Sequence, residues 1–200
     1  MKTQVVVIHG GDAFQKYEDY LESLRTNDVS LKKVRLVGWK AKLAKDLGED
    51  FDVLLLRMPN AQNARYNEWK IWFERFIPLF EDEIVLIGHS LGAIFLVKYL
   101  SENIYPKKIK STLLIGAPYN TPNNHPLVDF TITTSLDIFV KQSGKIVFYH
   151  SKDDEIVPFE NLERYKIAIP NATFNVFENR GHFNDESFPE IVGLIESFAS

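Results

Sequence analysis

Six short runs of apolar, mostly β-branched residues recur along the chain, each bounded by residues that favour turns. They are Val5–Ile8, Val53–Leu56, Ile84–Ile87, Thr112–Ile115, Ile146–Tyr149 and Phe174–Phe177. None of them alternates cleanly with polar residues, as a strand with one face in water would. Continuous apolar runs of this length are typical of strands covered on both faces, so they predict a mainly parallel sheet between layers of helices.

The segments between these runs carry apolar residues at helical spacing. The stripes are Phe14, Tyr17, Leu21 and Leu24; Trp39, Leu43 and Leu47; Trp69, Trp72, Phe73, Phe76 and Phe80; Ile94, Phe95, Val97 and Leu100; and Ile191, Leu194, Ile195 and Phe198. We interpret each stripe as core packing, and we expect Pro78 to end or kink its helix. The alternation predicts a six-stranded α/β fold with helices on both faces, in a single domain spanning residues 1–200.

The stretch from Tyr119 to Lys141 breaks this alternation with prolines, asparagines and scattered apolar residues. In a doubly wound sheet such an insertion projects from the carboxyl ends of the strands, where ligands bind. It either caps a substrate pocket or forms a plain surface excursion. Its aromatic residues Phe130 and Phe139, together with Tyr119, either line an apolar pocket or belong to the core.

Composition excludes several classes of function. The net charge is −4, so no nucleic-acid or anionic-membrane partner is expected. The chain has no cysteine, which excludes disulfides, a thiolate nucleophile and a cysteine-based zinc site. The apolar run before His9 is too short for a secretory signal, and no run approaches the roughly 18 residues of a membrane helix. We expect a cytoplasmic protein that works without a metal ion or another cofactor.

The segment from Gly88 to Gly92 reads G-x-S-x-G and lies between an apolar strand and an apolar helix. This context is the one that a nucleophilic serine requires. At such a turn the serine takes a strained backbone conformation that projects its hydroxyl above the sheet. The two glycines leave space where side chains would collide with the neighbouring strand and helix. The pattern predicts Ser90 as a nucleophile.

A serine hydroxyl is a poor nucleophile until a base takes its proton. His182 lies on a loop after the last strand, from which its imidazole can reach over Ser90, and we predict it as the base. The other histidines lie at strand ends, in the irregular stretch, or inside the turn with the side chain pointing away from the hydroxyl. They are His9, His150, His125 and His89.

Acidic residues after the fifth strand offer the third member, which holds the tautomer of the base and stabilises its imidazolium form. The chain order of serine, acid and histidine is the one that the α/β-hydrolase fold uses. Spacing alone does not separate Asp153 from Asp154. The pattern D-x-x-V-P, common in α/β-hydrolases, begins at Asp154 and ends at Val157-Pro158, so we predict Asp154.

Two backbone N–H groups are expected to hold the negative charge that develops on a carbonyl oxygen. One is the N–H of Leu91, just after the nucleophile. The other comes from the glycine pair after the first strand, where we favour Gly11 and keep Gly10 as the alternative. Loss of one such donor typically costs about 10²–10³ in rate.

Together these segments resemble the family of small serine hydrolases typified by retinoblastoma-binding protein nine. The resemblance covers most of the chain, in His9–Gly11, Met58–Asn60 followed by Trp69, Gly88–Ala93, Ser151–Asp154 with Val157-Pro158, and Gly181–Phe183. It implies a compact α/β-hydrolase core with little or no lid, and the second aspartate, Asp154, as the acid. The chain departs from the family pattern between Asp12 and Gly38, where we expect an extra helical segment that affects access to the pocket.

The resemblance also implies esterase-like or aminopeptidase-like acyl hydrolysis. We therefore expect a serine hydrolase that cleaves an ester, thioester or amide carbonyl of a small acyl substrate through an acyl-enzyme. A carboxylesterase-like enzyme, acting on ester bonds, is the first expectation. The alternatives are a serine aminopeptidase-like enzyme, or a protein-interaction module on a hydrolase scaffold with weak or vestigial activity, because fold does not fix function. The family's name records a protein partner.

Overall fold

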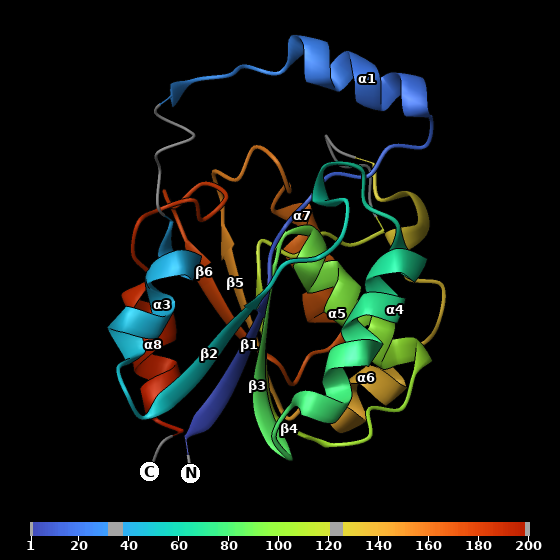
Figure 1. The fold of residues 1–200 in the computed structure, drawn as a ribbon. Helices are drawn as coiled ribbons and strands as arrows, with labels where there is room; N and C mark the ends of the chain where they lie inside the picture. The colour runs from blue at the N-terminus through green and yellow to red at the C-terminus, as the bar shows by residue number, and fades with distance from the viewer. Residues whose placement is uncertain (1, 32–37, 121–125, 199–200) are drawn as a thin grey trace.

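The centre of the structure is a sheet of six parallel strands in the order β2-β1-β3-β4-β5-β6 (Figure 1). It is seen in a computed structural model that describes residues 2–31, 38–120 and 126–198. The strands are β1 (Thr3–Ile8), β2 (Phe51–Leu56), β3 (Glu83–His89), β4 (Lys108–Ile115), β5 (Lys145–Ser151) and β6 (Thr173–Phe177). Each of the six apolar runs lies within one of these strands, so the predicted sheet is confirmed.

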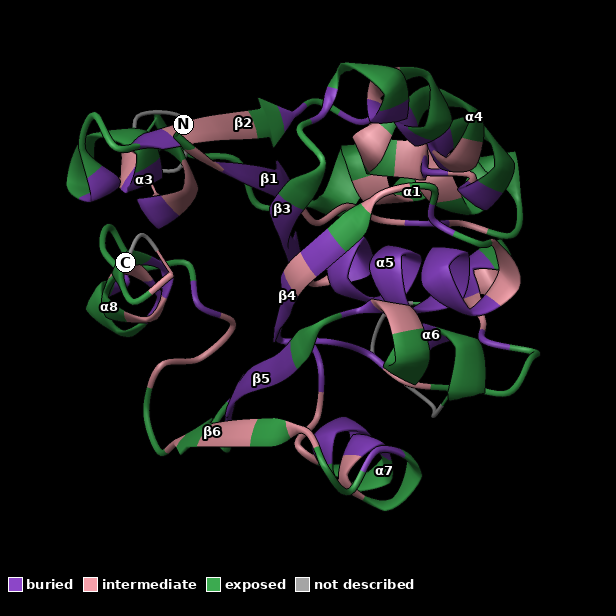
Figure 2. Ribbon diagram, turned by 90° about the horizontal axis from the view of Figure 1, so that it is seen from below, coloured by how far each residue is buried: buried purple, intermediate pink, exposed green. Residues whose placement is uncertain are grey.

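Helices cover both faces of the sheet (Figure 2). On one face lie α3 (Trp39–Leu47) and α8 (Pro189–Glu196); on the other lie α4 (Tyr66–Phe76), α5 (Leu91–Glu102), α6 (Asp137–Gln142) and α7 (Glu160–Ala168). In the part of the chain that the structure describes, short 3₁₀ segments join these elements at Ala61–Asn63, Ile77–Leu79 and Val128–Phe130. Pro78 lies in the second of them, directly after α4, so the predicted end of that helix is confirmed.

Strand β1 shows why the strand sequences are continuously apolar. Val6 and Ile8 belong to the core beneath the larger group of helices, whereas Val5 and Val7 belong to the core beneath α3 and α8. All four side chains have 0% exposure. Because successive side chains of a strand point to opposite faces, a strand between two helical layers needs an apolar residue at every position.

Helix α1 (Tyr17–Thr26) stands beyond the carboxyl edge of the sheet, apart from the body of the molecule (Figure 1). It buries no residue, and Tyr17 and Leu24 are 58% and 50% exposed. The prediction that its apolar stripe packs in the core is therefore wrong, because spacing shows that one face is apolar but not what covers it. The helix itself confirms the extra helical segment expected before Gly38. Since none of its own side chains is buried, α1 is not packed against the edge as a closed lid would be.

The irregular stretch holds more structure than its sequence indicates, since it contains a 3₁₀ turn and most of α6. Phe130 and Phe139 have 0% exposure and lie in the core, which decides between the two interpretations of these aromatic residues. Residues 121–125, which include His125, lie outside the described residues.

Two further details differ from the expected helices. Helix α7 was not expected from the sequence, yet it buries Leu162 and Tyr165 on one face. Trp72, assigned to a core stripe, is 37% exposed. Among the described residues, no helix is both long and apolar enough to cross a membrane.

Candidate active site

Ser90 occupies the sharp turn between β3 and α5, at the carboxyl edge of the sheet. Its backbone has φ 57° and ψ −123°, a strained conformation for a residue with a side chain. Its N–H donates to the carbonyl of Ile115 at 2.9 Å, which ties the turn to the end of β4. The predicted strain at this serine is confirmed.

The two glycines of G-x-S-x-G make this turn sterically feasible. A Cβ at Gly88 would lie 2.6 Å from the Cα of Ala93 in helix α5. A Cβ at Gly92 would lie 2.4 Å from the carbonyl oxygen of Ile8 in strand β1. Both distances are far below van der Waals contact, so the prediction that these positions must lack a side chain is confirmed.

The carboxylate of Asp154 contacts the imidazole of His182. The Nδ1–H of His182 donates to Oδ2 of Asp154 at 2.8 Å, and the carboxylate is fully buried. The other oxygen, Oδ1, accepts the backbone N–H groups of Ile156 and Val157 at 3.0 and 2.9 Å. The carboxylate is therefore fixed in position and presents one oxygen to the ring, which holds the proton of His182 on Nδ1.

The neighbouring Asp153 is oriented differently. It accepts a hydrogen bond from the hydroxyl of Ser151 and another from the backbone N–H of Gly181 at 2.9 Å. These hydrogen bonds, that of Ser151 above all, lower the pKa of the exposed Asp153 carboxyl. The structure thus brings Asp154, and not Asp153, to the ring of His182.

Ser90 and His182 both lie beside the backbone of Ile115 and Gly116. Ile115 accepts the N–H of Ser90, and a Cβ on the next residue, Gly116, would lie 3.1 Å from Cε1 of His182. The hydroxyl of Ser90 makes no hydrogen bond within the described parts of the chain. In unliganded enzymes catalytic hydrogen bonds are often long, so this geometry is compatible with a nucleophilic role for Ser90.

Both predicted oxyanion donors border a small cavity beside Ser90. Leu91 is the first residue of α5, so its N–H has no acceptor within the helix. Gly11 is held in place because Asp12 donates its N–H to the carbonyl of Ala61 at 2.8 Å. Gly10 packs against Ser90 but does not line the cavity, which favours Gly11 over Gly10.

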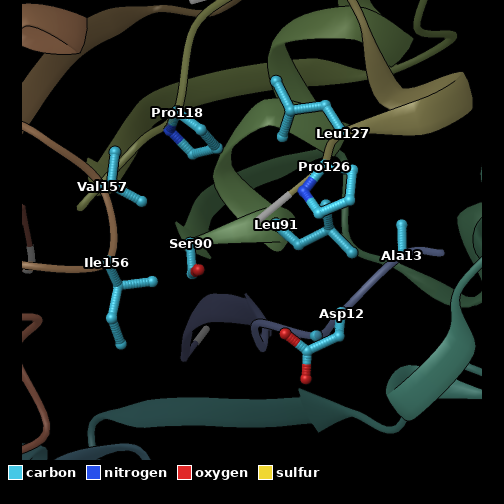
Figure 3. A pocket seen from close by; sticks show the side chains of 10 residues that line it. Asp12, Ala13, Ser90, Leu91, Pro118, Pro126, Leu127, Ile156 and Val157 are labelled. Atoms are coloured by element: carbon cyan, nitrogen blue, oxygen red, sulfur yellow. The ribbon is translucent and has the colours of Figure 1, made fainter. Parts of the chain in front are cut away.

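This cavity has a volume of about 40 Å³. Its lining is apolar apart from Ser90 and the carboxylate of Asp12 (Figure 3). The apolar side chains are those of Ala13, Leu91, Pro118, Pro126, Leu127, Ile156 and Val157. Pro126 and Leu127 come from the irregular stretch, so its described part borders the pocket rather than forming a separate surface excursion.

His89 and Lys40 are two contacts of the site that sequence reasoning missed. The ring of His89 lies 4.9 Å from that of His182, measured between centroids. Its Nδ1 lies 3.2 Å from Nζ of Lys40 on helix α3. The spacing of residues in the sequence indicates neither contact, because Lys40 and His182 both lie far from His89 along the chain.

Two further histidines of the described residues, His9 and His150, have structural partners. His9 accepts the backbone N–H of Met58 at Nε2, at 2.9 Å. His150 is fully buried, and its Nε2 lies 2.9 Å from the carbonyl of Val157, to which it donates. Burial lowers the pKa of His150. Nε2 of His150 also lies 4.0 Å from Oδ2 of Asp154, but its proton goes to Val157, whereas His182 makes the hydrogen bond of 2.8 Å to this oxygen.

Comparison with solved structures supports the α/β-hydrolase fold. The crystal structure of the ydeN gene product from B. subtilis matches with a TM-score of 0.70 at 20% identity, covering 98% of both chains. Naproxen esterase from Bacillus subtilis matches with a TM-score of 0.65 at 12% identity, covering 100% of this chain and 84% of its own. At these identities the similarity shows the fold alone.

Comparison of sequences supplies the family. Serine hydrolase RBBP9 of Rattus norvegicus is 23% identical over 165 residues, which is 80% of this chain and 86% of the relative. The YdeN protein of Bacillus subtilis (strain 168) is 27% identical over 152 residues, 73% of this chain and 80% of its own. The model of the serine hydrolase family matches residues 33–191. The buried carboxylate of Asp154 contacts His182 at the carboxyl edge of the sheet, where Ser90 also lies, which agrees with this match. Because the family model covers most of its length, the chain belongs to the serine hydrolase family.

Proposed function

We propose that this protein hydrolyses carboxylic esters of small acyl groups through a covalent acyl-enzyme on Ser90, His182 and Asp154. The observation that carries the proposal is the hydrogen bond of 2.8 Å between Nδ1 of His182 and the fully buried Asp154. It leaves Nε2 of the neutral imidazole without a proton, as a base must be. A strained serine at the same edge of the sheet supplies the nucleophile.

In the first half of the reaction, Oγ of Ser90 attacks the carbonyl carbon while Nε2 of His182 takes the hydroxyl proton. The carbonyl oxygen becomes negatively charged and accepts the N–H groups of Leu91 and Gly11. His182 then gives the proton to the leaving alkoxide. An alcohol departs, and the acyl group remains bound to Oγ.

In the second half, water attacks the acyl carbon and gives a proton to Nε2 of His182. The same two N–H groups hold the second oxyanion. Collapse of this intermediate returns the proton to Oγ of Ser90 and releases the carboxylic acid. Asp154 stabilises the imidazolium in both halves, because its charge lies against Nδ1 in a buried site.

The cavity beside Ser90 favours substrates with a short, uncharged acyl group. Its volume of about 40 Å³ holds about three water-sized groups, since one water needs about 10–15 Å³ on the same measure. The walls formed by Pro118, Leu127 and Val157 are apolar and solvate no charge, and the carboxylate of Asp12 in the lining repels an anionic chain. Acyl chains of about two to four carbons are expected to fit.

Hydrolysis of p-nitrophenyl esters with acyl chains of increasing length tests the proposal. We expect acetyl to butyryl esters to react and octanoyl esters to be at least tenfold poorer in kcat/KM. Ser90→Ala should lose nearly all turnover, by analogy with losses of about 10⁶-fold in other triads. Turnover retained in Ser90→Ala, or an enzyme that prefers the longest chain, would contradict the mechanism or the acyl preference respectively.

A further inference from the structure

His89 connects the turn of Ser90 to the backbone of the base. Its Nε2 lies 2.9 Å from the carbonyl oxygen of His182, and it is buried, with 4% exposure. A carbonyl oxygen can only accept, so Nε2 of His89 carries a proton and donates it. The residue next to the nucleophile therefore holds the main chain of the residue that activates the nucleophile.

Lys40 determines the state of the other nitrogen of this ring. Its Nζ lies 3.2 Å from Nδ1 of His89, and the ammonium group of a protonated lysine can only donate. Nδ1 of His89 is thus an acceptor without a proton, and the ring is neutral. Burial, and then the charge of Lys40, lowers the pKa of His89 well below its usual range, in agreement with these hydrogen bonds.

The segment around Lys40 is itself fixed to the loop of the base. The indole Nε1–H of Trp39 donates to the carbonyl of Phe183 at 2.9 Å, and its backbone N–H donates to the carbonyl of Asp185 at 3.0 Å. Lys42 forms an ion pair of 2.7 Å with Glu186. The start of helix α3 therefore contacts the residues that follow His182 at three places, independently of His89.

We infer that Lys40 and His89 are positioning residues for the base: Lys40 orients the ring of His89, and His89 holds the backbone of His182 so that its imidazole faces Ser90. This inference rests on the proposed function. Positioning matters because the hydrogen bond between Ser90 and His182 has yet to form in the unliganded site. A displacement of about 1 Å in a catalytic group can cost on the order of 10²-fold in rate.

A matched pair of substitutions tests the role of His89. Gln places an amide N–H near the position of Nε2 and can still donate to the carbonyl of His182, whereas Asn is one methylene shorter and cannot reach it. We expect kcat to fall about 30- to 100-fold in His89→Asn, with KM within about twofold, and to stay within about fivefold in His89→Gln. Equal kcat values in the two folded variants would overturn the inference.

A double-mutant cycle tests whether Lys40 acts through His89. We expect Lys40→Met to lower kcat about three- to tenfold, and the double variant with His89→Asn to be no slower than His89→Asn alone. Effects that multiply in the double variant would assign Lys40 a separate role and overturn the inference. If His89→Asn does not fold, an unchanged kcat in folded Lys40→Met overturns it instead.

A readout that needs no turnover separates this inference from the proposed function. The Nδ1 proton of His182 is expected as a downfield proton NMR signal, because it is held by Asp154 in a buried site. It should persist in His89→Gln and be broadened or lost in His89→Asn. A wild type without esterase turnover would refute the proposed function, whereas an unchanged signal in His89→Asn would refute the positioning role.

Discussion

Replacing Asp154 by asparagine tests the tautomer of the base, since asparagine is almost isosteric with aspartate. The side-chain amide has one acceptor oxygen where the carboxylate has two. The N–H groups of Ile156 and Val157, at 3.0 and 2.9 Å from Oδ1, both need an acceptor. Placing the oxygen elsewhere would leave both donors unpaired, which costs about 1–3 kcal/mol for the buried N–H of Val157 alone. The amide oxygen therefore stays with these donors, and the amide nitrogen faces His182.

With a donor opposite Nδ1, the imidazole of His182 moves its proton to Nε2. Nε2 can then no longer accept the proton of Ser90. Inversion of the tautomer in a Ser-His-Asp triad costs about 10⁴-fold in kcat, or about 5 kcal/mol of transition-state stabilisation. Steady-state hydrolysis of p-nitrophenyl butyrate measures this loss, and thermal unfolding checks that Asp154→Asn is folded.

Asp153→Asn is the matched control. Asp153 accepts from Gly181 and Ser151 through one oxygen, Oδ1, and an amide oxygen can do the same. We expect its kcat to stay within about threefold of wild type. A folded Asp154→Asn within tenfold of wild type, or an equal loss in the two variants, would refute the assignment of Asp154 as the acid.

Three further predictions concern packing, specificity and pH. Gly92→Ala should lower the free energy of unfolding by at least about 2 kcal/mol, because the added Cβ meets backbone atoms. The control Gly193→Ala in α8 should not be destabilised, because nothing lies within 4 Å of the added Cβ. Urea unfolding that shows equal effects in the two variants would contradict this. Leu127→Ala should raise kcat/KM for the hexanoyl relative to the butyryl ester about tenfold, because it lengthens the cavity, and an unchanged ratio would place the acyl group elsewhere. Burial lowers the pKa of Lys40 from 10.5 to about 8, so between these values the unfolded chain binds more protons and stability rises with pH. From pH 8 to pH 10 the free energy of unfolding should rise by up to about 2 kcal/mol more in wild type than in Lys40→Met. Urea unfolding that shows the same pH dependence in both proteins would contradict this.

The sheet could be predicted from the sequence because each strand between two helical layers must be apolar at every position. The run Val5–Ile8 carries this signal without ambiguity. Helix α1 shows the limit of the same reasoning, since the spacing of Tyr17 and Leu24 fits a core helix equally well. Helix α7 was not expected, because Leu162 and Tyr165 are the only apolar side chains that it buries, and two residues make a weak stripe.

The candidate site was predictable where residues near in sequence determine the geometry. Gly88 and Gly92 flank Ser90 within one turn, so steric reasoning applies directly. The choice of Asp154 over Asp153 rested on a pattern, and the two backbone hydrogen bonds to its carboxylate give the physical reason for that pattern. The contact of Lys40 with His89 joins residues 49 positions apart, which only the fold brings together.

Covalent labelling with a fluorophosphonate is the measurement that tests the central claim most directly. The reagent loses fluoride when an activated serine attacks its phosphorus, so the site of attachment can be mapped by mass spectrometry of the digested protein. We predict that wild type is labelled at Ser90 and that labelling is lost in both Ser90→Ala and His182→Ala. Labelling retained in either folded variant, or no labelling of folded wild type, would contradict it.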